Sequence, residues 1–190
     1  MPIINNNAKE IHCKIIYYGP LGSGKNSCLQ FIKNHSSKDK VRSFSLPLDM
    51  PLEALVIDIG RILGLKTSFH IYSIPQLTLE EKKLLVRGVD GIVFVANSAT
   101  DFAQKNLQSL QELDGILKEQ EVNIFKIPMV FQYHKRDLDA PLSIQDLRTS
   151  LNKYNCKDFE SSIKQEQNIL EPLKHLFKSV ITSLKSGETL

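Results

Sequence analysis

The chain has 190 residues, of which 42% are hydrophobic and 24% charged, so it can bury a full core and is too short for two ordinary domains. Its formal net charge of +3 is mild and its Lys and Arg residues are scattered, which argues against binding to nucleic acid. No apolar run reaches the roughly 18 residues that a membrane span needs, and residues 1–10 do not resemble a signal peptide. We therefore expect a single domain over residues 1–190, in a cytoplasmic protein without membrane insertion.

Apolar runs of strand length alternate along the chain with segments of helical period. The expected strands, two of them continuous apolar runs typical of strands buried on both faces, are residues 11–18, 65–74, 91–96 and 127–133. The expected helices lie near residues 25–35, 79–85, 107–117, 144–147 and 169–184. Such alternation is typical of parallel βαβ units and predicts a three-layer α/β fold with a mostly parallel central sheet.

A glycine-rich turn follows the first of these strands. Residues 19–25 read GPLGSGK and open the next helix, and in that context the GxxxxGK pattern predicts the phosphate-binding loop of a P-loop NTPase domain. Its backbone N–H groups and the helix N-terminus would surround phosphate oxygens, and the lysine would reach the β- and γ-phosphates. The residues expected to hold phosphate are Gly19, Gly22, Ser23, Gly24 and Lys25. The alternative is a plain glycine-rich turn with a solvated lysine.

The position after this lysine departs from the pattern. A Ser or Thr there would ligate Mg²⁺ through its hydroxyl, whereas this chain has Asn26. Ser27 follows, but it should point about 100° further around the helix. We expect Asn26 to be a weak Mg²⁺ ligand, which would disfavour a triphosphate more than a diphosphate because the metal bridges the β- and γ-phosphates.

A second motif follows the strand that ends near residue 133. Residues 134–137 read HKRD, close to the NKxD element by which GTPases read guanine. Asp137 would accept hydrogen bonds from the N1–H and the exocyclic amine of guanine, and the stem of Lys135 would lie against the ring. His134 replaces the Asn, and a neutral imidazole can still donate one bond. Ser162 and Lys164 fall where a third base-contacting loop would lie. Together with the phosphate loop, these residues make GTP or GDP the expected ligand. The alternative for residues 134–137 is an exposed basic turn that ends in a helix-capping Asp.

Four stretches of the chain, residues 14–20, 66–72, 87–96 and 131–138, resemble the MglA family of bacterial Ras-like GTPases. The resemblance implies a small GTPase-like domain that binds GTP, hydrolyses it very slowly and controls the cell poles from which motility machinery acts. It also implies partners among polarity or motility regulators, of the Roadblock or response-regulator type, a protein that is a monomer alone, and recruitment to a cell pole.

The chain departs from this family in both switch regions. Where the family has Asp-Arg-Thr, residues 49–51 read DMP, so Met50 offers no charge to the transferring phosphoryl group and Pro51 has neither a hydroxyl nor an N–H. Where the family has Pro-Gly-Gln, residues 74–77 read IPQL. Gln76 is then the candidate for the displaced catalytic Gln, and the Gly is missing.

Two functions are open on these grounds. The first is a regulatory protein that acts by binding partners, with weakened guanine-nucleotide and Mg²⁺ binding and little or no intrinsic hydrolysis. The second is an active slow GTPase in which Ser27, Gln76 and a trans-acting activating partner restore the missing groups. We favour the first, because hydrolysis needs metal, water and charge positioned together. An adenine-nucleotide phosphotransferase is disfavoured by Asp137.

Two further features bear on function. His70 is expected to be a packed strand residue and not a metal ligand, because no second ligand is placed near it in the sequence. The apolar segment of residues 46–59 is either a partner-binding surface or a strand packed in the sheet.

Overall fold

The computed structural model describes residues 2–37, 41–46 and 52–186, with backbone alone for 43–46 and 52–53. The described strands form one mixed sheet in the order β3-β4-β5-β2-β6-β7-β8, and β1 pairs with β2. Strands β5, β2, β6, β7 and β8 run parallel to their neighbours in this series, whereas the pairs β1–β2, β3–β4 and β4–β5 are antiparallel. The strands are β1 (Ile3–Asn5), β2 (Glu10–Tyr18), β3 (Val41–Leu46), β4 (Leu52–Ile62), β5 (Leu65–Ser73), β6 (Gly91–Asn97), β7 (Met129–His134) and β8 (Lys157–Glu160).

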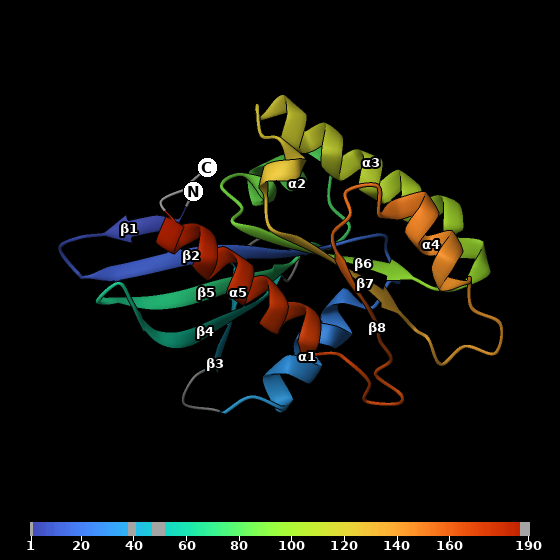
Figure 1. The fold of residues 1–190 in the computed structure, drawn as a ribbon, viewed down its shortest axis with the longest axis horizontal. Coiled ribbons are helices and arrows are strands. Elements are labelled where there is room, and N and C mark those ends of the chain that lie inside the picture. Colours follow the sequence, from blue (N-terminus) through green and yellow to red (C-terminus); the bar gives the residue numbers. More distant parts are fainter. Residues whose placement is uncertain (1, 38–40, 47–51, 187–190) are drawn as a thin grey trace.

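Helices cover both faces of the sheet (Figure 1). On one face lie α1 (Lys25–Asn34) and α5 (Glu171–Ser186); on the other lie α2 (Leu79–Val86), α3 (Ala103–Glu119) and α4 (Ile144–Leu151). Two short 3₁₀ turns, η1 (Thr100–Phe102) and η2 (Ile124–Lys126), complete the connections on the second face. None of the helices in the described part of the chain combines the length and the apolar character needed to cross a membrane.

Alternation along β2 divides the core into two layers. Ile15 and Tyr17 pack with the buried residues of α1 and α5, whereas Ile16 and Tyr18 pack with those of α3 and α4. This is the period-two pattern of a strand with a helix layer on each side. All residues of β6 and β7 are buried, which explains why both read as continuous apolar runs. The predicted three-layer α/β fold with a mostly parallel sheet is confirmed.

The segment of residues 46–59 is a strand over the part that the structure describes. From residue 52 onward it belongs to β4, which pairs with β3 on one side and β5 on the other, and Leu55 is buried. The interpretation as a packed strand is therefore confirmed for that part. Asp49, Met50 and Pro51 lie outside the described residues, so the altered first switch stays a prediction.

Candidate functional site

The candidate residues gather at one edge of the sheet. Strands β2, β5, β6 and β7 are parallel, so their carboxyl ends meet at the same edge, and ligands of such sheets bind there where the strand order reverses. The turn of residues 19–24 leaves β2 at this edge, between the end of β5 at Ser73 and the end of β6 at Asn97. The ends of β7 and β8 bring the second motif beside it.

Two positions of the glycine-rich turn admit only glycine. Gly19 has a φ of +145°, and a Cβ placed there would lie 2.2 Å from the carbonyl oxygen of Val95. Gly24, which precedes α1, has a φ of +98°, and a Cβ there would lie 2.5 Å from Cδ2 of His134. Side chains rarely adopt such backbone conformations. The close approach of this turn to the ends of β6 and β7 therefore depends on the glycines of the motif.

Lys25 is buried against its own turn. Its side chain is only 7% exposed, and Nζ donates to the carbonyl oxygens of Gly19, at 2.8 Å, and Pro20, at 2.9 Å. Burial, together with the nearby charge of Lys82, lowers the pKa of Lys25 to about 8. An ammonium has three donors, so the turn's carbonyls account for two of them, and a buried cation is stabilised by an anion at the third. Lys25 is thus poised for a phosphate oxygen.

A cavity of about 580 Å³ opens over this turn. Three lysines line it, namely Lys25, Lys82 and Lys105, together with one carboxylate, Glu112. Glu112 is already engaged, because Lys82 Nζ donates to it at 2.8 Å and the Tyr18 hydroxyl bonds to it as well. The excess of positive charge suits a polyphosphate.

Gln76 also lines this cavity, between the turn and α2. Its side chain is exposed. The candidate for the displaced glutamine therefore faces the same space as the phosphate loop.

The position of the Mg²⁺ ligand is held by neutral groups. The hydroxyl of Ser73, at the end of β5, donates to the side-chain oxygen of Asn26. Ser27 is exposed on α1, and neither it nor Asn26 nor Ser73 is among the residues that line the cavity. Within the described ranges no group of three or more His, Cys, Asp or Glu side chains could hold a metal. A metal here would depend on Asn26, Ser73 and phosphate oxygens, a weaker set than one with a carboxylate.

His134 supports the glycine-rich turn from the end of β7. It is 3% exposed, and its Nδ1 lies 2.9 Å from Oγ of Ser161. Burial is the main cause that lowers its pKa, to about 4, so the imidazole is neutral near pH 7. The ring lies against the backbone of Gly24, and packing thus joins the two motifs.

A hydrogen bond from a neighbouring loop orients the side chain of Asp137. Ser162 Oγ donates to Asp137 Oδ1 at 2.6 Å, and this bond is the first cause that lowers the pKa of Asp137. The carboxylate is partly exposed, and the charge of the exposed Lys164 also favours its ionised form. Lys135 has a φ of +63° and places its Nζ 6.0 Å from the centre of the Phe102 ring. The five predicted base-side residues, His134, Lys135, Asp137, Ser162 and Lys164, thus lie at the ends of β7 and β8.

One polar group that attaches the glycine-rich turn to the sheet, the side chain of Asn97, was not predicted from the sequence. Asn97 Nδ2 donates to the carbonyl oxygen of Gly22 at 3.0 Å, and Asn97 Oδ1 accepts from the N–H of Ala99. Asn106 on α3 exchanges two further bonds with the Asn97 backbone. The signal for it was an Asn directly after the apolar run of β6. Ser73, Lys82 and Phe102 were also missed; they lie on other elements, and only the fold brings them to the site.

Comparison of the sequence with models of protein families finds no match. The chain is 38% identical over 194 residues to the mutual gliding-motility protein MglA of Myxococcus xanthus (strain DK1622), in an alignment that covers 98% of this chain and 100% of that protein.

Proposed function

The chain belongs to the MglA family of small GTPases, and from that premise we propose that it is a small G-protein that regulates gliding motility or cell polarity through partner proteins. In this proposal it binds GTP and GDP weakly, depends little on Mg²⁺, and hydrolyses GTP slowly or not at all. The observation that supports the proposal is that Asn26 follows Lys25 where the phosphate-loop pattern has a Ser or Thr, and that its side-chain oxygen accepts a hydrogen bond from the Ser73 hydroxyl.

Guanine-nucleotide binding follows from the two halves of the site. Lys25 and the N–H groups of its turn would bind the phosphates, and the lysine-rich cavity would attract them. The Asp137 carboxylate, oriented by Ser162, would accept two N–H donors from guanine, a pair that adenine does not offer. Gly19, Gly22, Ser23 and Gly24 would supply backbone contacts, and His134, Lys135 and Lys164 would support the base side.

Weak use of the metal follows from the donor set. Mg²⁺, if bound, would neutralise part of the charge of the phosphates. In this chain Asn26 and Ser73 would hold it with uncharged oxygens, which bind Mg²⁺ more weakly than a set that includes a carboxylate. Discrimination between GTP and GDP, which relies on that metal in related folds, is then expected to be small.

Slow hydrolysis follows from the groups around the cavity. Its described lining contains lysines and Gln76 but no arginine. Lysine is a compact point charge, whereas an arginine provides the planar fork that stabilises a transferring phosphoryl group. Together with the predicted loss at Met50 and Pro51, this favours a protein that acts by binding.

The partners in this proposal are polarity or motility regulators, including a Roadblock-type or response-regulator protein. The relative from Myxococcus xanthus is named for gliding motility. We place the protein in the cytoplasm as a single-domain monomer over residues 1–190, recruited to a cell pole by such a partner.

The alternative, an active slow GTPase completed by a trans-acting partner, is favoured by one observation. Gln76 faces the cavity that Lys25 lines, so a partner that ordered it could align an attacking water. Ser27 would have to turn toward the metal site. Multiple-turnover hydrolysis that appears only with the partner would support this alternative.

Calorimetric titration of nucleotide-free protein with GDP and with ADP tests the proposal. We expect GDP to bind at least tenfold more tightly than ADP, which is about 1.4 kcal/mol, because adenine leaves the Asp137 carboxylate without its two donors. Equal affinity for the two nucleotides, or saturable binding of neither, would overturn the proposed guanine-nucleotide site.

A further inference from the structure

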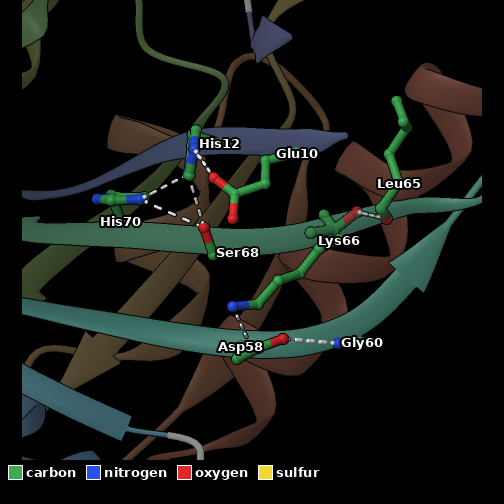
Figure 2. A network of polar contacts seen from close by, with 9 residues as sticks. Glu10, His12, Asp58, Gly60, Leu65, Lys66, Ser68 and His70 are labelled. Carbon is green, nitrogen blue, oxygen red and sulfur yellow. Dashed lines mark hydrogen bonds and ion pairs between the residues drawn. The ribbon is translucent and has the colours of Figure 1, made fainter. Parts of the chain in front are cut away.

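Two histidines lie close together on the neighbouring strands β2 and β5 (Figure 2). His12 on β2 and His70 on β5 lie with Nδ1 of the first 3.2 Å from Nε2 of the second. Their rings are nearly perpendicular, at 80°, with centroids 5.1 Å apart. His70 was expected to be a packed strand residue, because no second ligand is placed near it in the sequence. The parallel register of β2 and β5 nevertheless brings His12, 58 positions away, beside it.

A hydroxyl completes a triangle with the two nitrogens. Oγ of Ser68 lies 2.9 Å from Nδ1 of His12 and 3.3 Å from Nε2 of His70. Two nitrogens bound to one tetrahedral ion at about 2.0–2.1 Å lie about 3.3 Å apart, which is close to the spacing in this chain. We propose that His12 and His70, with the hydroxyl of Ser68, bind a divalent transition-metal ion such as Zn²⁺ or Ni²⁺.

A carboxylate orients the first of these imidazoles. Oε2 of Glu10 lies 3.3 Å from Nε2 of His12, on the side of the ring away from His70 (Figure 2). An Nε2–H that faces a carboxylate leaves Nδ1 with its lone pair, and metal-binding histidines usually have this kind of partner. The neutral imidazole is the form that ligates a metal ion.

The surroundings leave the site open to solvent. It borders a cavity of about 530 Å³ whose lining also includes Arg42, Val56 and Lys66, and the helices on this face lie over the opposite part of the sheet (Figure 1). Lys66 is paired with Asp58 at 3.6 Å. The positive charge of Arg42 would repel a metal ion at this site, so we expect its affinity for the ion to be moderate. Water or an anion would fill the remaining coordination positions.

The site is separate from the phosphate loop. Six residues of β2 lead from His12 to Tyr18, roughly 20 Å at about 3.3 Å per residue, and neither imidazole lines the cavity over the turn. The described residues offer no cluster of three or more His, Cys, Asp or Glu side chains for a metal, so this site depends on two imidazoles and one hydroxyl. It stands independently of the proposed nucleotide binding.

The test is calorimetric titration of the full chain with ZnCl₂ and NiCl₂ in the absence of nucleotide. We expect one ion per chain, and an affinity that falls at least tenfold in His12→Gln and in His70→Gln. Glu10→Gln should weaken binding by about tenfold, since partners of ligating histidines contribute about 10–100-fold. His35→Gln, an exposed histidine at the end of α1, and Cys156→Ser are the controls and should leave the affinity unchanged.

Nitrogen NMR of the wild-type histidines gives a second measurement that needs no variant. Addition of Zn²⁺ should shift Nδ1 of His12 and Nε2 of His70 before any other imidazole nitrogen, and binding should weaken as the pH falls below about 6, where imidazole protonates. Absence of saturable binding by the wild type would overturn the proposal. So would binding that is unchanged in both histidine variants, or a first shift at another histidine.

Discussion

The imidazole of His134 packs directly on the backbone of Gly24. A Cβ built on Gly24 would lie 2.5 Å from Cδ2 and 2.9 Å from Nε2 of that ring. This contact joins the end of β7, where the guanine-reading motif begins, to the N-terminus of α1, where the phosphate loop ends. A change on either side should therefore affect both halves of the site.

Substitution of Gly24 by Ala should destabilise the protein by about 2–5 kcal/mol. Left-handed backbone strain for a residue with a Cβ accounts for roughly 1–2 kcal/mol, and the collision with His134 adds an overpacking cost of about 1–3 kcal/mol. Gly60→Ala is the matched control, because Gly60 has a φ of +90° and nothing within 4 Å of its Cβ position. Equal losses in the two variants, measured by urea unfolding, would mean that the His134 contact contributes nothing.

The stability of the protein should depend on His134 at mildly acid pH. Burial lowers the pKa of His134 from its ordinary value of 6.5 to about 4, so between these values the unfolded chain binds a proton that the folded chain does not. The free energy of unfolding therefore falls as the pH drops from 6.5 to 4, by up to about 3 kcal/mol from this group. Unfolding of the wild type and of His134→Asn across this range should show a smaller loss in the variant; parallel curves would contradict this.

Asn97→Ala should loosen the phosphate loop. The change removes the buried bonds from Asn97 Nδ2 to the Gly22 carbonyl and from the Ala99 N–H to Asn97 Oδ1, at a cost of about 1–3 kcal/mol. Affinity for GDP should fall with it. Asn123→Ala, which removes one exposed bond to the Phe125 N–H, is the control and should leave GDP affinity as it is. A wild-type GDP affinity in Asn97→Ala would speak against this brace.

Asp137→Asn should change the preferred base from guanine to xanthine. A carboxylate accepts the two N–H donors of guanine, whereas an Asn amide offers one acceptor and one donor, which match the N1–H and the adjacent carbonyl of xanthine. Titrations with GDP and with the xanthine nucleotide should reverse in order between wild type and variant. Asp139→Asn, at an exposed neighbour, should keep the guanine preference. An unchanged order in Asp137→Asn would remove Asp137 from the base site.

Local patterns were enough to predict the inner strands and the motifs on them. Strands β6 and β7 are buried on both faces, so their composition alone identifies them, and the GxxxxGK pattern lies in one continuous turn between a strand and a helix. The edge strand β8 was not predicted, because three of its four residues, KDFE, are charged and none is more than partly buried. The short strands β1 and β3 were not predicted either, because each is defined by its pairing with a neighbouring strand and not by a local sequence pattern.

The contacts that the sequence could not predict are those between distant strands. The Ser73 hydroxyl meets Asn26 across 47 positions, and His12 meets His70 across 58. Both contacts depend on the register of β5, because a shift of one residue would move its side chains to the opposite face of the sheet. Ser162 was predicted from its place in the chain, where a third base-contacting loop would lie, but its bond to Asp137, which joins the ends of two strands, was not.

The most direct test of the account compares GDP with a non-hydrolysable GTP analogue, each titrated calorimetrically into nucleotide-free protein with and without Mg²⁺. Because Asn26 offers only a neutral oxygen that is bonded to Ser73, we expect Mg²⁺ to change the affinity for either nucleotide by less than tenfold, about 1.4 kcal/mol. Asn26→Thr should restore a larger Mg²⁺ effect on the GTP analogue. Tight binding of the analogue by the wild type that requires Mg²⁺ would contradict the account and identify a working GTPase switch.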